Sequence, residues 1–599
     1  MGFELIILIF KRVPVVALIC CFGFKAIALD TATLTAPGAP KNLLEALRAS
    51  SLSIAAKRDG VNSAQDILAA ARADYTRLVG VLYANARYGG VVHIYVDGRE
   101  AASIAPLAAP RQIRDIRISV DPGPVFRFGT ALIAPMAPQV ILPDGFATGQ
   151  PANSGVIGDA VSAAITGWRD AGFAKAQVAA QDLRADHRTQ RLDTSVRLSP
   201  GTQLRFGQLI LEGESAVHVR RIQQIADLRQ GGVFSPADVD AVATRLRRTG
   251  AFRSVAISEA EKQNADGTLD ITAQLVDEKP NRFGFGAEIS TGKGATLSGF
   301  WLHRNLFGGA ERLRVDGEVS GIGGISGGAD LKFGARYERP ATFGPDTSLF
   351  VVAKAEQLDE LDFLSTHFGL GGGVTRIFSK ELSGELALEW RQARVEDKFG
   401  VQKYDLVSLP LSLTWDQRDK ALNASSGHYL QTEFRPFLGF GNMSSGARFY
   451  ADGRIYRSMS DRLVLAGRLQ MGSVYGPGVA VAPPDYLFYS GGGGSVRGQG
   501  YQSLGIDLAS GQRRGGRSFL GVSAEARFEV TDTIGIVGFA DTGYIGSGSI
   551  FDNSGNWHSG VGLGLRYNTG IGPIRLDVAV PVGGTGIGAQ IYIGIGQSF

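Results

Sequence analysis

The chain has 599 residues, more than one ordinary domain of ~100–200 residues, and its 61 basic and 57 acidic side chains leave a net charge of +4. Because these charges are spread out, with neither a basic block nor an acidic tail, nucleic acid is not an expected partner. Glycine is the outlier with 81 residues, about twice the typical ~7%, and the absence of a G-X-Y period excludes a collagen-like chain.

The first 28 residues have the pattern of a secretory signal peptide. A basic pair, Lys11-Arg12, precedes an apolar stretch from Val13 to Phe24, and Ala26-Ile27-Ala28 fits an A-x-A cleavage site. The alternative is an uncleaved anchor helix, for which this apolar stretch is short. The two cysteines, Cys20 and Cys21, lie inside the leader, so we expect neither disulfides nor thiolate chemistry in the mature chain.

A repeated pattern occupies residues 29–279. The tripeptide Arg-Phe-Gly recurs with its glycine at positions 129, 207 and 284, at intervals of 207 − 129 = 78 and 284 − 207 = 77 residues. Ahead of each copy a helical pattern ends in glycine, which suits a left-handed helix cap. A strand pattern follows each glycine, at Val91–Val96, Phe173–Val178 and Phe252–Ile257. Each unit therefore reads as strand, helix, helix, strand, strand.

Three such units resemble POTRA domains, the periplasmic modules that precede certain outer-membrane barrels, and the expected ranges are 29–121, 122–202 and 203–279. The third unit is the clearest, and the first has no recognisable opening strand before Leu43. The elements predicted for the third unit are strand Leu204–Leu211, helix Val219–Leu228, a helix starting at Ser235-Pro236, and the strands Phe252–Ile257 and Leu269–Val276. The alternative is a generic α/β repeat that acts only as a spacer. Repeats of this sort usually present sheet edges that capture extended peptides.

Residues 281–599 form a long region of alternating strands. Apolar side chains at Phe283, Phe285 and Ile289 alternate with small or polar ones, and the same period of two returns over residues 591–596. This period is typical of membrane-spanning strands that turn apolar residues to lipid and small or polar ones to the lumen. The 599 − 281 + 1 = 319 residues accommodate about 16 strands of ~9–11 residues with their connections. The predicted fold is therefore a series of α+β POTRA-like repeats followed by an all-β barrel of about 16 antiparallel strands in outer-membrane lipid.

The first and last strands of the predicted barrel, Phe283–Ser290 and Ala589–Phe599, are expected to meet at a seam. Glycine weakens both strands because it leaves nothing to pack, and the glycines concerned are Gly284, Gly286, Gly594 and Gly596. Phe599 is expected on the apolar side at the last position of the final strand. A terminal phenylalanine there resembles the signal by which bacterial outer-membrane barrels are recognised for assembly.

Several motifs of this region resemble those of the BamA/TamA superfamily, outer-membrane barrels that insert or export other proteins. His303–Gly309 resembles its Asn-Leu-Phe-Gly turn. Asp416-Gln417-Arg418-Asp419, followed by Ser426-Gly427, resembles its D-x-R-D…G segment, although Ala424 stands where proline is usual. Phe539-Ala540-Asp541-Thr542-Gly543 matches its F-x-D-x-G strand, and Gly562–Pro581 matches its penultimate strand pair.

The stretch Gly491–Tyr501 carries the most informative resemblance. Val496-Arg497-Gly498 matches the V-R-G-[FY] loop of the superfamily, but Gln499 replaces the aromatic residue, whose packing Tyr501 is expected to supply. The resemblance implies that the loop folds into the lumen and that Arg497 pairs with Asp541, in the strand segment marked by Phe539 and Gly543. Because desolvation offsets much of the attraction, the pair is expected to fix the loop rather than to add much stability. The alternative is a solvated loop arginine.

The sequence contains little that indicates a catalytic or metal site. Gly324-Ile325-Ser326-Gly327-Gly328 matches G-x-S-x-G, but no helix pattern follows it, as a nucleophile elbow requires. The seven histidines have no metal-ligand spacing. We therefore expect no enzymatic activity, no metal and no other cofactor.

Three repeats resemble the TamA branch, because the general barrel-assembly subunit of the superfamily usually carries five POTRA domains and two-partner secretion pores usually carry two. The resemblance implies an outer-membrane protein with its N-terminal domains in the periplasm. It would insert or translocate client outer-membrane proteins, such as autotransporters, together with a TamB-type partner anchored in the inner membrane. The alternatives are a general barrel-assembly subunit, a two-partner secretion pore and a passive porin.

Overall fold

The computed structural model describes residues 29–599, except for a few positions in turns and loops. The positions not described are 107–108, 326, 399, 442, 510, 553, 571 and 583–587. The predicted leader, with Cys20 and Cys21, lies outside the described residues. By its internal contacts the chain divides into two compact units, one containing residues up to 204 with 233–236, the other residues 205–232 with 237–599.

The first unit contains two sheets. The first sheet has the order β1-β4-β2-β3, and strand β1 shows that an opening strand does precede Leu43. The sequence did not reveal this strand because Thr31–Thr35 is rich in threonine, and its two inward residues are the small, partly buried Ala32 and the buried Leu34. The elements are β1 (Thr31–Thr35), α1 (Lys41–Ser50), α2 (Leu52–Arg58), α3 (Ala64–Ala84), β2 (Val91–Val96), β3 (Arg99–Glu100), η1 (Ala101–Ser103) and β4 (Asp115–Asp121).

The second sheet, with the order β5-β7-β6, is covered by one helix where the repeat predicted two. Its elements are β5 (Arg127–Ala134), α4 (Ser154–Asp170), β6 (Gln177–Asp186) and β7 (Arg191–Ser199). Pro135, Pro138 and Pro143 stand where the first helix was expected, and proline removes a hydrogen bond from a helix interior and clashes with the preceding turn. The strand predicted at Phe173–Val178 begins only at Gln177.

The third sheet, with the order β8-β10-β9, follows the predicted pattern and belongs to the same compact unit as the barrel. Its elements are β8 (Arg205–Glu212), α5 (Val219–Ala226), α6 (Pro236–Arg248), β9 (Phe252–Glu259) and β10 (Thr268–Asp277). Gly250 follows α6 with φ +69°, in the left-handed region that the capping pattern predicted. Strand β10 leads through residues 278–280 into the barrel.

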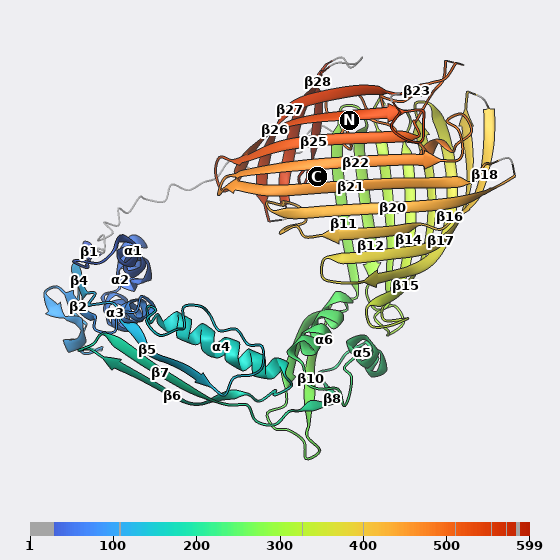
Figure 1. Cartoon of the computed structure of the whole chain (residues 1–599). Coiled ribbons are helices and arrows are strands. Elements are labelled where there is room, and N and C mark those ends of the chain that lie inside the picture. The colour runs from blue at the N-terminus through green and yellow to red at the C-terminus, as the bar shows by residue number, and fades with distance from the viewer. Residues whose placement is uncertain are drawn as a thin grey trace, which may run out of the picture. The chain divides into compact units, whose positions relative to one another are not determined.

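The barrel closes as 16 antiparallel strands, as the sequence predicted. Segments β18 and β19 are two halves of one strand, because both lie between β17 and β20. Figure 1 shows β11 to β28 following one another around the wall, from green to red. The segments are β11 (Asn281–Ser290), β12 (Gly294–His303), β13 (Arg312–Ile322), β14 (Asp330–Arg339), β15 (Thr347–Glu360), β16 (Phe363–Ile377), β17 (Leu382–Asp397), β18 (Gly400–Ser408), β19 (Leu411–Asp416), β20 (Gly427–Phe440), β21 (Gly446–Ser460), β22 (Leu463–Tyr475), β25 (Ser518–Glu529), β26 (Ile534–Gly546), β27 (Asn556–Thr569), β28 (Gly572–Val582) and β29 (Gln590–Ile595).

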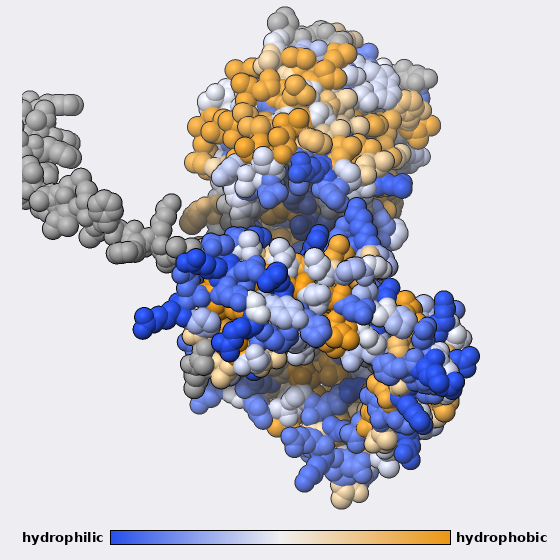
Figure 2. Space-filling view, turned by 90° about the vertical axis from the view of Figure 1, so that its left-hand side faces the viewer, coloured by the Kyte–Doolittle hydropathy of each residue, from blue (hydrophilic) through white to orange (hydrophobic). Residues whose placement is uncertain are grey.

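The barrel wall turns apolar side chains outward along each strand. In β29 the isoleucines at 591, 593 and 595 are exposed, whereas Tyr592 and Gly594 are buried toward the lumen, as the alternation predicted. Hydrophobic residues accordingly cover much of the visible barrel surface (Figure 2). Among the helices of the described residues, none has the length and apolarity needed to cross a membrane.

Successive strands run in opposite directions, so alternate connections lie at the same end of the barrel. The turns 304–311, 340–346 and 417–426 share the end at which β11 begins, and residues 596–599 lie there too. The connection 476–517 leaves from the opposite end. We call these the near end and the far end.

Candidate functional site

The longest connection of the barrel, residues 476–517, folds back into the lumen instead of standing outside it. It contains the short elements η2 (Pro484–Tyr486), β23 (Ile506–Asp507) and β24 (Arg513–Arg514). Val496, Arg497 and Gln499 are almost fully buried, with Arg497 only 2% exposed. The loop that the V-R-G motif marked therefore lies against inward-facing residues of the wall, and we call residues 476–517 the lumen loop.

Arg497 binds the wall through every part of its guanidinium group. Its Nε and Nη2 donate to the two carboxylate oxygens of Asp541 on β26, at 2.7 and 2.9 Å, and its backbone N–H donates to the same carboxylate at 3.1 Å. Nη1 donates to Glu525 on β25 at 2.6 Å and lies 3.5 Å from Asp577 on β28. The guanidinium also stacks 3.6 Å above the ring centre of Phe539. The contact predicted between Arg497 and Asp541 is therefore present, with two further acidic partners.

Glu525 and Asp577 were not predicted from the sequence as partners of Arg497. Both are charged residues at inward positions of alternating strands, which is the signal that would have found them. Two more arginines complete the group: Arg527 Nε donates to Glu525 at 2.8 Å, and Arg566 bonds to Asp577. Three arginines and three carboxylates thus form one buried, charge-balanced network, and charge balance is what makes burial of such groups tolerable.

Two glycines allow the lumen loop to approach the wall this closely. Gly498 has φ +91°, and a Cβ there would lie 2.5 Å from the carbonyl oxygen of Val580. On the wall, a Cβ at Gly560 of β27 would lie 1.9 Å from the carbonyl oxygen of Arg497. Atoms cannot approach to that distance, so both positions need a residue without a side chain.

The side chains of Gln499 and Tyr501 make contacts that differ from the predicted ones. Gln499 is itself buried and donates from Nε2 to the carbonyl oxygen of Ser559 at 2.6 Å. Tyr501 does not take its place: the tyrosine hydroxyl donates to Glu360 on β15 at 3.2 Å, and its ring lies under the ammonium of Lys293. The hydrogen bond to Ser559 is what makes burial of the Gln499 amide tolerable, and Tyr501 contacts a different part of the wall.

The lumen loop is also fixed to the wall formed by β15–β17. Arg513 Nε donates to Asp362, between β15 and β16, at 3.0 Å. Two further arginine–carboxylate pairs join the loop to β17, namely Arg391 with Asp485 and Arg514 with Asp397. Together with the Arg497 network on β25–β28, these pairs tie the loop to two distant parts of the barrel wall.

The junction between the first and last strands is much shorter than the other junctions. Strands β11 and β29 share two residue pairs, Ile289 with Ile593 and Ser290 with Tyr592, whereas β11 and β12 share ten. Side chains add a hydrogen bond of 2.8 Å between Thr291 and Gln590, and an ion pair of 2.9 Å between Glu288 and Arg575. We call this junction the seam. The predicted first strand is confirmed, and Gly284 and Gly286 lie on its part that β29 does not reach.

The prediction that the last strand extends to Phe599 is wrong. Strand β29 ends at Ile595, and Gly596 has φ +92°, a backbone conformation that turns the chain out of the strand. Phe599 lies in a buried cluster with Ala424, Tyr456 and Ala466 and is 7% exposed. It therefore packs inside the barrel and not on the lipid face.

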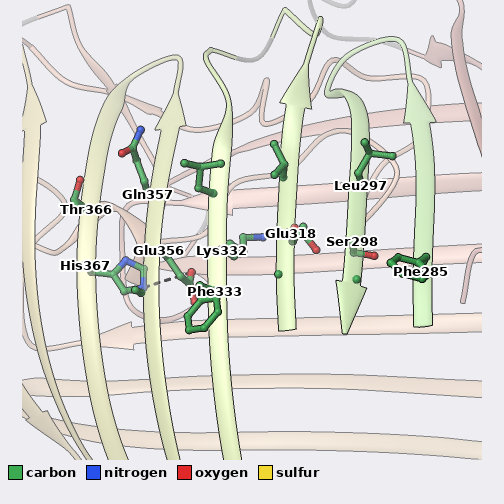
Figure 3. A pocket seen from close by; sticks show the side chains of 15 residues that line it. Phe285, Leu297, Ser298, Glu318, Lys332, Phe333, Glu356, Gln357, Thr366 and His367 are labelled. Carbon is green, nitrogen blue, oxygen red and sulfur yellow. Dashed lines mark hydrogen bonds and ion pairs between the residues drawn. The ribbon is translucent and has the colours of Figure 1, made fainter. Parts of the chain in front are cut away.

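A pocket of about 570 Å³ lies on strands β11–β16, next to the seam (Figure 3). Gly299 and Gly317 face each other in register, flanked by the exposed rings of Phe285 and Phe333. A Cβ at Gly317 would have nothing within 4 Å. On the alternate face, the His367 ring lies 3.4 Å from Glu356. The wall beside the seam is therefore thinly packed with side chains.

Helices α5 and α6 of the third sheet pack against near-end turns of the barrel. Arg248 and Arg245 donate to the Asp346 carboxylate at 2.6 and 3.0 Å, and Arg221 donates to the carbonyl oxygen of Pro340 at 2.6 Å. Although burial opposes it, hydrogen bonding by the two arginines holds the pKa of Asp346 below its ordinary value. We call the contact of Arg245 and Arg248 with Asp346 the near-end clamp.

Within the described residues no group of three or more histidine, cysteine, aspartate or glutamate side chains has the geometry to hold a metal ion. The G-x-S-x-G match falls between β13 and β14, and its serine, Ser326, lies outside the described residues.

A closed 16-strand barrel with an apolar outer face and a lumen loop defines a transmembrane β-barrel of the outer-membrane type. Residues 305–599, just under half of the chain, match the model of the Omp85 superfamily domain. The chain is 26% identical over 360 residues to outer envelope protein 80, chloroplastic, of Arabidopsis thaliana. That match covers 52% of this chain but only 45% of the relative, so the chain spans less than half of its length.

Two solved structures share the fold. BamA from Haemophilus ducreyi lacking POTRA domains 1–3 has a TM-score of 0.61 at 15% identity, over 78% of this chain and 100% of that one. CdiB from Acinetobacter baumannii has a TM-score of 0.51 at 14% identity, over 79% of this chain and 90% of that one. At these identities the likeness concerns the fold.

Proposed function

We propose that this chain is an outer-membrane protein that inserts or translocates other outer-membrane proteins through a barrel that opens sideways at the seam. Residues 1–28 act in this proposal as the signal peptide, and residues 29–121, 122–202 and 203–279 as periplasmic POTRA-like domains. The match of residues 305–599 to the Omp85 superfamily domain and one sheet within each of the three ranges support it.

The short seam is the observation that carries the proposal. A backbone hydrogen bond contributes only about 1 kcal/mol net, so a junction of two residue pairs opens at a far lower cost than one of ten. Opening exposes the backbone of β11, and an unpaired strand edge is a template for pairing with another chain. A client strand would add there by the same hydrogen bonding that builds the barrel.

The finer proposal is a TamA-type subunit that works with a TamB-type partner anchored in the inner membrane. The sequence resemblance and the number of sheets ahead of the barrel support this assignment. Affinity purification of the tagged chain from membranes tests it, because a TamB-type protein should co-purify. Recovery of one secreted polypeptide instead would favour a two-partner secretion pore, and recovery of a multi-subunit barrel-assembly complex would favour the general assembly role.

A disulfide across the seam tests lateral opening. Ile289→Cys with Ile593→Cys joins an outward-facing residue pair of the seam, in a strain whose only copy of the chain is this variant. Under oxidising conditions the outer membrane should lose client proteins, as measured by quantitative mass spectrometry, and a reductant should restore them. The matched control, Ala287→Cys with Leu297→Cys, joins β11 to β12 and should change nothing. An unchanged outer membrane with a fully oxidised seam would contradict the proposal.

A further inference from the structure

The near-end turn between β19 and β20, residues 417–426, is stabilised by side chains of the D-x-R-D motif, Asp416–Asp419. Arg418 forms two hydrogen bonds with the Asp416 carboxylate, at 2.9 and 2.8 Å, and a third with the carbonyl oxygen of Ala421 at 3.1 Å. Asp419 accepts hydrogen bonds from the backbone N–H of Ser425 at 2.9 Å and from its hydroxyl at 2.6 Å. The turn is therefore braced from within, and we call it the strap.

The strap touches the last residues of the chain, although β19 and β20 lie far from β29 in the order of strands. The carbonyl oxygen of Leu422 accepts from the backbone N–H of Gln597 at 3.2 Å, and Asn423 accepts from the Gln597 side chain at 2.9 Å. These contacts join the turn between β19 and β20 to the residues that follow β29, on a different part of the wall. The strap therefore crosses the near end of the lumen. We call residues 596–599 the tail.

Other parts of the wall hold the tail in the same place. Arg527 on β25 donates to the carbonyl oxygens of both Ala424, in the strap, and Phe599, in the tail, at 3.4 and 3.0 Å. Arg566 on β27 donates to the Gln597 side chain at 2.7 Å. Arg527 and Arg566 are also members of the network that binds Arg497, so the lumen loop, the strap and the tail are connected through two arginines.

The position of the tail leaves part of β11 without a paired strand on its seam side, although its other side pairs with β12 throughout. The seam pairs Ile289 with Ile593, and in an antiparallel ladder the sum of the two residue numbers stays constant. A tail that continued β29 would therefore place Gln597 opposite Phe285. In the structure Gln597 contacts the strap instead, and no residue of β29 pairs with β11 before Ile289.

We propose that the strap regulates the seam by holding the tail inside the lumen, which keeps β29 from pairing with the seam-side backbone of residues 281–288 of β11 and leaves that edge to a client strand. The last clause rests on the proposed function, whereas the capture of the tail by the strap does not. Releasing the strap would let the tail extend β29 and lengthen the seam, because the backbone groups of the tail and of β11 would then pair with each other.

Disulfide trapping tests where the tail lies. In a background with Cys20→Ser and Cys21→Ser, one variant carries Asn423→Cys and Gln597→Cys and a second carries Phe285→Cys and Gln597→Cys. Gln597→Cys keeps the backbone N–H that bonds to Leu422. With the strap intact, we expect the 423–597 disulfide to form and the 285–597 disulfide to stay at background.

The strap is then weakened by Arg418→Ala with Asp419→Ala, which removes its internal braces without removing an atom that touches the tail. We expect the yield of the 285–597 disulfide to rise at least five-fold and that of the 423–597 disulfide to fall. Asp461→Ala, in the near-end turn between β21 and β22, is the matched control and should alter neither yield. Heat-modifiable gel mobility identifies the folded molecules that are counted, and Leu422→Gly is a milder second variant, for which a smaller shift in the same direction is expected.

Equal 285–597 yields with intact and weakened straps would overturn the proposal. The outer-membrane protein profile of the same strap variants separates this outcome from a failure of the proposed function. If the disulfide yields shift as expected while client proteins stay at wild-type levels, the strap holds the tail and the client-insertion role is contradicted. If the yields shift and client proteins fall, both proposals are supported.

Discussion

At the scale of single residues, the buried charges of the lumen decide whether the loop stays in place. Arg497 faces three carboxylates, and Arg527 and Arg566 bring the charge of the network to zero. The sequence identified Arg497 and Asp541 because both lie in recognisable motifs. It left Glu525 and Asp577 unassigned, because a strand pattern shows which face a residue is on but not which residue lies across the lumen.

Arg497→Ala should destabilise the folded barrel by roughly 3–5 kcal/mol, because it leaves the network with one uncompensated buried negative charge. The stability of Arg497→Lys should lie between that of Arg497→Ala and that of the wild type, since lysine restores the charge but cannot form the paired hydrogen bonds to Asp541. The temperature at which the compact band disappears in unheated-versus-heated gel electrophoresis measures both effects. A wild-type transition in Arg497→Ala would mean that the pair does not hold the loop.

At the scale of elements, the strand pattern was sufficient to predict the barrel strands but not the irregular segments at their ends. A period of two over most of residues 281–599 predicts strands, because one face of a membrane strand meets lipid and the other meets the lumen, and the length of the region predicts their number. The end of β29 was missed because the turn at Gly596 depends on the strap, which lies more than a hundred residues earlier. The absence of the first helix over the second sheet could have been predicted from the prolines at 135, 138 and 143, which interrupt the pattern of the repeat.

The close contact between the lumen loop and β27 gives a test at the same scale. Gly560→Ala should destabilise the barrel by roughly 1–3 kcal/mol, because its Cβ would overlap the carbonyl oxygen of Arg497 and push the loop away. Gly334→Ala on β14 is the control, since a Cβ there has nothing within 4 Å, and it should be neutral or slightly stabilising. Protease cleavage of the lumen loop in folded protein reports the displacement, and equal cleavage in both variants would contradict it.

At the scale of the whole molecule, the sequence predicted the three repeats and the barrel but not their connection at the near end. The near-end clamp joins Arg245 and Arg248 on α6 to Asp346 in a barrel turn. No local pattern marks these residues, because an exposed helix face and an exposed turn look alike whether or not they meet. The clamp depends on the packing of the third sheet and the barrel into one compact unit, which the sequence does not predict.

The clamp should release only in acid. Because the pKa of Asp346 is held below its ordinary value, which is about 3.9, the stabilisation is complete above the ordinary value and is lost as the pH falls through the lowered one. Asp346→Asn should remove it at every pH, at about 1 kcal/mol per pair or less, since the groups are partly exposed. Spin labels introduced by Asp240→Cys on α6 and Phe343→Cys in the turn measure the distance. Release at neutral pH in the wild type would contradict the expected direction.

The direction in which the chain is made gives the lumen loop one further property. Glu525, Asp541 and Asp577 all follow Arg497 in sequence, and so does Tyr592, whose hydroxyl accepts a hydrogen bond from the backbone N–H of Gly498. The Arg497 part of the loop therefore has no binding site until β25–β29 have joined the wall, whereas the partners on β15–β17 precede the loop, so docking of Arg497 has to be a late event in the biogenesis of this barrel. Contacts between segments distant in sequence form slowly. An incomplete barrel thus carries its arginine undocked, and the docked loop distinguishes a finished molecule from an unfinished one.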